Sequence, residues 1–522
     1  MSAYTYPGVY IQELPSAVHT ITGVATSVAA FVGWADQGST TQATLVESWS
    51  DYQTQFGGLD SRTLLGYAVN QFFGNGGSQA YIVRLANSDA DTASSASAGG
   101  FKIGGLPVYA ANPGGWGSYI AVTVTISPAD ATRFSVLVQQ MPTTTGGSAK
   151  TLESFANLSL NSNDPQGNYA ITVIDSESNY ITFIDPASPA TVPTPTTTTP
   201  TAVVQTSLSG GSDGTVLVPN DGKFEPALNI TGSGSGVALL SEVFFNLLCV
   251  PGETTASTIS SLQTFCSNPE NRAFYIVDAP STATYSSLNG SGPAGTGGGS
   301  ITTEPQSAYS AYYFPWVSAP DALAGNRSRL FPPCGFIAGI YSATDAARGV
   351  WKAPAGIDAG LSGISGLQYT LTDPQNGDLN KQAINCLRTF PVYGNIVWGA
   401  RTLDGNDQVG SQWKYVPIRR LALFLESSLY QGTQWAVFEP NDETLWGQLR
   451  LNIGAFMQGL FQQGAFQGTT PQQAYFVKCD AENNPQSSID LGIVNVTVGF
   501  APLYPAEFVV IQIAQMAGQS QS

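Results

Sequence analysis

Few residues in this chain could do catalytic chemistry. Its 522 residues include a single histidine, His19, so a Ser-His-Asp or Cys-His arrangement would have to place that N-terminal residue in an active site. The acidic pair Asp404 and Asp407 lies in TLDGNDQVG, whose Gly, Asn and Asp residues are typical of a turn. We therefore predict no catalytic residues and interpret the acidic pair as part of a loop.

Cofactor and metal sites also lack support in the sequence. There is no GxxxxGK[ST] phosphate loop, and GSGSG at 232–236 lacks the spacing of a dinucleotide-binding turn. The five cysteines are widely separated, with no CxxC pair, which argues against a zinc site or a disulfide framework. We predict no cofactor, no metal, and free, buried thiols in a reducing cytosol, at Cys249, Cys266, Cys334, Cys386 and Cys479.

The charge of the chain is low in density and uneven. Only 11% of residues are charged, and the net charge is −17. Residues 1–345 hold 9 basic and 23 acidic residues, a balance of −14, whereas residues 346–522 hold 10 and 13, a balance of −3. Such a chain lacks the clustered cations that nucleic acid requires, and a surface poor in charge favours association. We predict no nucleic-acid partner.

The densest basic stretch is WKYVPIRRL at 413–421, which contains Lys414, Arg419 and Arg420. One interpretation is an ordinary strand with solvated or ion-paired cations. The other is a charge-matched contact with a second protein. The glycine-rich segment NPGGWGSYIAV at 112–122 also has two interpretations. It is either a ligand-binding loop or a structural turn that leads into a strand.

Both ends of the chain carry a strand-like segment without a neighbouring partner. GVYIQEL at 8–14 alternates between two faces and is bounded by Pro7 and Pro15, which cannot continue a ladder. EFVVIQIAQM at 507–516 alternates as well. We predict that both strands pair with other subunits, through Val9, Tyr10 and Ile11 at one end and Phe508, Val509, Val510, Ile511 and Ile513 at the other.

The rest of the chain indicates a mixed α/β architecture. Hydrophobic periodicity predicts buried strands at 27–35 and 80–85 around a helix at 61–73. It predicts a β-rich stretch with strands at 120–127, 133–141, 168–175 and 180–185. In the last module it predicts a helix at 445–466 and strands at 474–479 and 493–502. No run of 18 apolar residues and no signal-peptide pattern occurs, so we expect no direct membrane insertion.

Several stretches, taken in order, resemble the sheath proteins of contractile phage tails and related contractile injection systems. They cover the chain except for roughly 120–330. The longest are YPGVYIQELPSAVHTITGVATSVAAFVGWA at 6–35 and FPPCGFIAGIYSATDAARGVWKAPAG at 331–356. Shorter ones are FGG at 56–58, YAVNQFFGNGG at 67–77, the NPGGWGS turn, VWGARTL at 397–403, WKYVPIRRL, WAVFEPND at 435–442, YFVKCD at 475–480 and APLYPAEFVV at 501–510.

The resemblance implies a structural protein and not an enzyme. It implies an α/β, or mixed α+β, multidomain fold with a core built from N- and C-terminal parts, a β-rich insertion, a subtilisin-like central domain without a triad, and extended terminal arms. Such subunits form hexameric rings in a helix around an inner tube, with baseplate and terminal cap proteins as further partners. They assemble in the bacterial cytoplasm into a phage tail or tail-like particle, which lysis can release.

These expectations give a domain plan in six parts. It comprises an N-terminal strand-exchange arm (1–22), the first part of the core (23–94), a β-rich outer insertion (95–232), a central α/β domain (233–390), an inner, tube-facing C-terminal domain (391–504) and a C-terminal arm (505–522). The relatively basic C-terminal third makes Lys414, Arg419 and Arg420 candidates for a contact with the tube or the core.

Two other classes of function stay open from sequence. A self-assembling surface-layer or adhesin-like protein would fit the charge-poor, threonine-rich composition. A hydrolase on the central α/β module would be an enzyme, although the chain offers only His19 for a triad.

Overall fold

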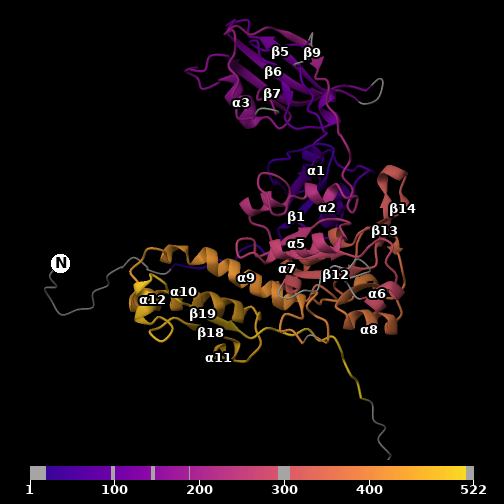
Figure 1. Ribbon diagram of the computed structural model, residues 1–522, viewed down its shortest axis with the longest axis vertical. Coiled ribbons are helices and arrows are strands. Elements are labelled where there is room, and N and C mark those ends of the chain that lie inside the picture. The colour runs from indigo at the N-terminus through magenta and orange to yellow at the C-terminus, as the bar shows by residue number, and fades with distance from the viewer. Residues whose placement is uncertain are drawn as a thin grey trace, which may run out of the picture. The chain divides into compact units, whose positions relative to one another are not determined.

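The computed structural model describes residues 19–95, 100–142, 147–186, 189–291, 306–408 and 410–512 (Figure 1). The chain divides into two compact units. The larger comprises Thr26–Arg348 and Ala353–Arg419, and the smaller comprises the remainder of the described chain.

An eight-stranded sheet forms the centre of the larger unit. Its strand order is β17-β16-β12-β11-β10-β1-β3-β2, parallel throughout except at the two edges, where β2 and β17 are antiparallel to their neighbours. The central strands are apolar and fully buried, as expected for strands covered on both faces. The strands are β1 (Ala29–Trp34), β2 (Thr44–Val46), β3 (Ala80–Leu85), β10 (Leu247–Cys249), β11 (Phe274–Asp278), β12 (Ser310–Phe314), β16 (Ile384–Phe390) and β17 (Gly394–Val397).

Helices accompany this sheet, in keeping with an α/β layer. They are α1 (Trp49–Phe56), α2 (Leu65–Gly74), α4 (Phe224–Ala227), α5 (Ala256–Ser267), α6 (Tyr285–Ser291), α7 (Cys334–Arg348) and α8 (Asp373–Lys381). A small antiparallel sheet adds β13 (Val317–Asp321), β14 (Arg327–Phe331) and β15 (Gly366–Leu367). The mixed α/β multidomain fold is therefore confirmed, as are the strands at 27–35 and 80–85 and the helix between them.

The N-terminal part of the described chain divides between the two units: residues 19–25 group with the C-terminal part, where Ile21 joins its apolar cluster, and the strands from Ala29 on belong to the larger unit. Strands β1 and β3 of the first core segment join β10, β11 and β12 of the central part in one sheet. The physical reason is that β1 pairs in parallel with β3 along one edge and with β10 along the other. Neither edge of β1 therefore remains for a strand from the C-terminal part.

The insertion is a four-stranded antiparallel sheet in the order β7-β6-β5-β9, with its own apolar core (Figure 1). Its elements are β4 (Tyr109–Ala110), β5 (Ile120–Ile126), β6 (Arg133–Gln140), β7 (Lys150–Ser159), α3 (Ala170–Glu177), β8 (Ile181–Thr182) and β9 (Val203–Ser207). The strand predicted at 168–175 is wrong, because that segment forms α3. Ala170, Ile171 and Ile174 are buried, at the spacing of a helix. A segment of eight residues is too short for its apolar pattern to separate a helix from a strand.

The NPGGWGS segment leads into β5 as a structural turn. Gly114 has φ +141°, and a side chain there would place its Cβ 2.7 Å from the carbonyl oxygen of Asp36. The turn is held by Arg84 of β3, whose guanidinium donates to the carbonyl oxygens of Ala35, Gly38, Asp36 and Pro113 at 2.8, 2.8, 2.9 and 2.8 Å. This buried cation ties the loop after β1 to the beginning of the insertion.

The smaller unit packs two helices against a two-stranded sheet (Figure 1). Its elements are α9 (Val416–Gly432), which enters the unit from Arg420 on, α10 (Glu443–Gln462), α11 (Pro471–Ala474), β18 (Tyr475–Lys478), α12 (Gln486–Asp490) and β19 (Thr497–Phe500). Asp442 caps α10 by accepting from the backbone N–H groups of Thr444 and Leu445. The helix predicted at 445–466 and both strands predicted here are confirmed.

Candidate assembly interfaces

The two-stranded sheet of β18 and β19 has two open edges. The strands pair antiparallel with each other, from Tyr475 opposite Phe500 to Lys478 opposite Thr497, and within the described ranges neither has a second strand beside it. Side chains from α9 and α10 pack with residues of both strands in one apolar cluster. A two-stranded sheet is only marginally stable alone, and an open edge is a template for another strand.

An aromatic side chain of β18 packs over the backbone of β19. Phe476 stands opposite Gly499, and a Cβ at Gly499 would lie 2.1 Å from its ring. The glycine therefore allows the ring to lie over the neighbouring backbone, as aromatic residues do over strand glycines. Phe476 nevertheless stays 56% exposed, which leaves apolar surface beside the open edge.

The C-terminal segment carries a second exposed apolar surface. Residues 503–512 form no strand in the single chain. The side chains of Phe508, Val509, Val510 and Ile511 are 77–81% exposed. Four consecutive exposed apolar residues are uncommon on a folded surface and are typical of a segment that a partner covers.

The other residues predicted to pair with neighbouring subunits lie outside the described part of the chain. Val9, Tyr10 and Ile11, and likewise Ile513, lie outside the described residues. Their pairing with other subunits stays a prediction.

The basic stretch at 413–421 was interpreted as a strand, but most of it is helical. Helix α9 begins at Val416, with Pro417 in its first turn. The guanidinium carbon of Arg419 lies over the rings of Tyr309 at 4.0 Å and Trp413 at 4.7 Å, a buried cation–π arrangement.

Burial decides which of the three cations a partner could reach. Arg419 and Arg420 are 4% and 3% exposed, so both belong to the interior of this chain. Lys414 is only partly buried and pairs with Asp407 at 2.6 Å. The contact with an inner tube stays a prediction, and burial confines it to Lys414.

The candidate catalytic residues have structural partners. His19 stacks on Trp435 with ring centroids 4.2 Å apart. Asp407 joins Lys414 to Arg401, whose guanidinium lies 2.9 Å away. All five cysteines are free and buried, as predicted. Among the described residues there is no group of three or more His, Cys, Asp or Glu that could hold a metal, and no helix is both long and apolar enough to cross a membrane.

Sequence reasoning missed two buried carboxyl groups after adjacent sheet strands, Glu253 beyond β10 and Asp278 at the end of β11. Burial raises the pKa of Glu253 to about 7 and that of Asp278 to about 6. Asp278 accepts from the backbone N–H groups of Gly252 at 3.0 Å and Cys334 at 2.8 Å, and so caps the start of α7. Neither carboxyl group reaches the surface, so neither could act on a substrate. An acidic residue directly after an apolar run was the available signal.

Two family profiles match the chain in succession. The phage tail sheath protein central domain matches residues 232–403, and the phage tail sheath C-terminal domain matches residues 408–515. Together the two matches cover more than half of the chain.

Individual relatives share shorter stretches. The tail sheath protein of Vibrio phage KVP40 is 26% identical over 187 residues, which are 36% of this chain and 26% of that protein. A putative prophage major tail sheath protein of Pseudomonas aeruginosa is 27% identical over 190 residues, which are 35% of this chain and 46% of that protein. The aligned stretches thus span less than half of the length of these relatives.

Solved structures align over nearly the whole chain. The contracted sheath of PVC, an extracellular contractile injection system, gives a TM-score of 0.56 at 23% identity, with 99% of both chains covered. The contracted helical sheath of the anti-feeding prophage gives 0.57 at 23% identity, covering 98% of this chain and 100% of that one. The sheath tail protein Lin1278 of Listeria innocua gives 0.60 at 12% identity, covering 93% and 97%. At these identities the likeness establishes a shared fold.

Proposed function

Because this chain belongs to the phage tail sheath family, we propose that it is the sheath subunit of a phage tail or phage tail-like injection particle. It polymerises helically around an inner tube and contracts to drive that tube through a target envelope. The observation that carries this proposal is the successive match of both sheath domains over residues 232–403 and 408–515. The family is structural and is not known for enzymes.

Subunits are linked by strands that leave their own chain. The open edges of β18 and β19 are the acceptors, and the segments 8–14 and 505–522 of neighbouring copies are the donors. Main-chain hydrogen bonds give such a contact its strength, and alternate side chains fix its register. Each exposed apolar side chain that becomes covered contributes about 1.5–3 kcal/mol before entropy costs.

A donor and an acceptor on different surfaces of one chain make a heterologous contact. Such contacts propagate as rings or open helices, which is the geometry a sheath needs. The arms act as tethers that survive contraction, while the folded units rotate and form new lateral contacts. Each subunit need release only a few kcal/mol, because many subunits contract together.

The remaining positions follow from the same proposal. The insertion at 95–232 lies on the outside, the domain at 391–504 faces the tube with Lys414 as its available cation, and 233–390 is the subtilisin-like domain without a triad. The partners are other copies in six-fold rings, the inner tube protein, and baseplate and terminal cap proteins. Support comes from related chains solved in the helical sheath and in the baseplate of the anti-feeding prophage.

Electron microscopy of the full chain and of one deletion variant tests the linkage. The full chain, expressed at high level, should form hollow striated cylinders in negative stain. Deletion of residues 1–16 should leave a folded monomer that forms none, because half of the donated strands are absent. Cylinders of normal length from that variant would refute the tether, whereas discrete particles from the full chain together with its tube would refute the sheath assignment itself.

A further inference from the structure

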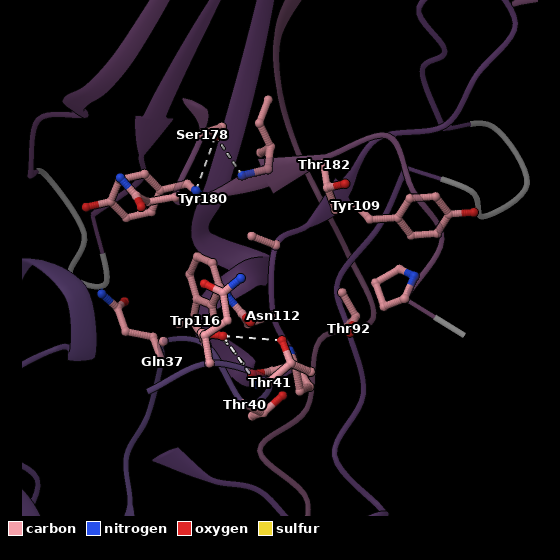
Figure 2. A pocket seen from close by; sticks show the side chains of 18 of the residues that line it. Gln37, Thr40, Thr41, Thr92, Tyr109, Asn112, Trp116, Ser178, Tyr180 and Thr182 are labelled. Carbon is pink, nitrogen blue, oxygen red and sulfur yellow. Dashed lines mark hydrogen bonds between the residues drawn. The ribbon is translucent and has the colours of Figure 1, made fainter. Parts of the chain in front are cut away.

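A cleft of about 860 Å³ lies within the larger unit, where the loop after β1 and the end of α1 meet the insertion (Figure 2). One wall comes from residues 37–44 and 54–56, and the other from 90–92, 109–116 and 175–182. Its volume falls within the roughly 300–1,000 Å³ typical of small-molecule sites. The proposed sheath function makes no use of this cleft.

The floor of the cleft is held firmly before any ligand arrives. The four backbone acceptors of Arg84 fix the loop at 35–38 against the insertion turn at Pro113. Across the junction, the Tyr180 hydroxyl donates to the carbonyl oxygen of Thr54 at 3.2 Å. A pre-formed site of this kind loses little entropy when it binds a ligand.

The walls of the cleft offer uncharged hydrogen-bonding groups that the chain leaves unused. Thr40, Thr92 and Asn112 are half-buried, and their side chains have no hydrogen-bond partner in the described part of the chain. Of the residues described as lining the cleft, none is Lys, Arg or His. An anionic ligand would therefore find no counter-charge here.

Two of the three acidic side chains that line the cleft are engaged by neutral donors. Asp175 accepts from the Thr182 hydroxyl at 2.7 Å and from the Phe183 N–H at 2.8 Å. Tyr109 is hydrogen-bonded to Asp185. These contacts partly satisfy the two carboxylates and so reduce their attraction for a free cation.

Four aromatic residues complete the lining: Tyr109 and Tyr180 are half-buried, and Phe56 and Trp116 are buried. Trp116 and Tyr180 meet edge to face, with ring centroids 6.3 Å apart, and Figure 2 shows Tyr109 on the opposite side of the view. A pyranose ring presents an apolar C–H face and a rim of hydroxyl groups, so it matches aromatic rings beside uncharged donors and acceptors. We propose that this cleft binds a neutral saccharide, and so gives the particle a sugar-recognition site.

The test uses the full chain and one double variant. Asn112→Ala with Thr92→Val removes unused polar groups and disturbs no intramolecular hydrogen bond of their side chains. Asn163→Ala with Thr151→Val makes the same two changes at exposed positions outside the cleft. Each protein is applied to an array of neutral glycans, and binding of the hits is measured by saturation-transfer NMR and calorimetry.

We expect the full chain and the control variant to bind at least one neutral glycan with equal affinity, and the cleft variant to bind it at least tenfold more weakly. The proposal is overturned if no neutral glycan binds, or if the cleft variant binds as well as the control. It is also overturned if the cleft prefers the cationic probe spermidine in a salt-sensitive manner. None of these results bears on sheath assembly.

Discussion

Replacing Arg84 by methionine should strongly destabilise the larger unit. Arg84 is 1% exposed, and its guanidinium donates to four backbone carbonyl oxygens. Burial lowers its pKa to about 10, so it stays charged at neutral pH. Methionine keeps most of the side-chain volume but leaves the four acceptors without this donor. Hydrogen bonds to a charged group contribute about 1.5–3 kcal/mol each but do not add fully, so we expect a loss of about 3–5 kcal/mol.

The matched control is Arg62→Met in the same neighbourhood. Arg62 forms ion pairs with Asp60 at 2.6 Å and Asp213 at 2.8 Å, but its side chain is 45% exposed. Exposed ion pairs are worth about 1 kcal/mol or less, so this variant should lose no more than that. Both losses are measured from urea unfolding and from hydrogen exchange of the β5 amides. Equal losses in the two variants, or a loss below about 1 kcal/mol for Arg84→Met, would show that the buried cation does not hold the insertion turn.

Three further predictions follow from buried groups and from the C-terminal segment. The pKa of Glu253 rises from its ordinary value of 4.5 to about 7, so its stabilising proton is lost as pH rises through that window. The free energy of unfolding should therefore fall between pH 4.5 and 7, and Glu253→Gln should remove up to about 3 kcal/mol of that fall. The control Glu242→Gln, at an exposed position, should leave the fall in place. Thermal melts of Glu253→Gln that depend on pH just as those of the unchanged chain do would contradict this. Both amide atoms of buried Asn452 lack hydrogen-bond partners in the described chain, so Asn452→Leu should stabilise the protein by about 1–2 kcal/mol in urea, and destabilisation would argue against the reasoning. Deletion of 505–522 should abolish cylinders in negative stain without lowering the melting temperature by more than a few degrees, and intact cylinders would show that this segment does not link subunits.

Much of the fold could be predicted wherever the apolar residues repeat clearly with the period of a helix or of a strand. The strands at 27–35 and 80–85 and the helix at 445–466 were readable because their apolar residues repeat over enough positions to exclude the other period. The helix α3 was missed because eight residues fit both periods.

The interior polar groups were harder to predict than the elements. Arg419 looked like a surface cation in the sequence, yet two aromatic rings from distant positions, Tyr309 and Trp413, bury it. Asp278 looked like a strand end, and its capping of α7 depends on a contact across 56 residues. Such pairings depend on tertiary structure, which local patterns do not encode.

Cysteine cross-linking between subunits shows whether the C-terminal segment of one copy completes the sheet of the next. The five native thiols are buried, so a maleimide cross-linker should act on added cysteines in the assembled sheath. Two single variants, Phe476→Cys beside the open edge of β18 and Val510→Cys in the C-terminal segment, are assembled separately and together. If the segment of one copy completes the sheet of the next, cross-linked dimers should form only in the mixed assembly. Monomers alone from well-formed mixed cylinders would contradict the account.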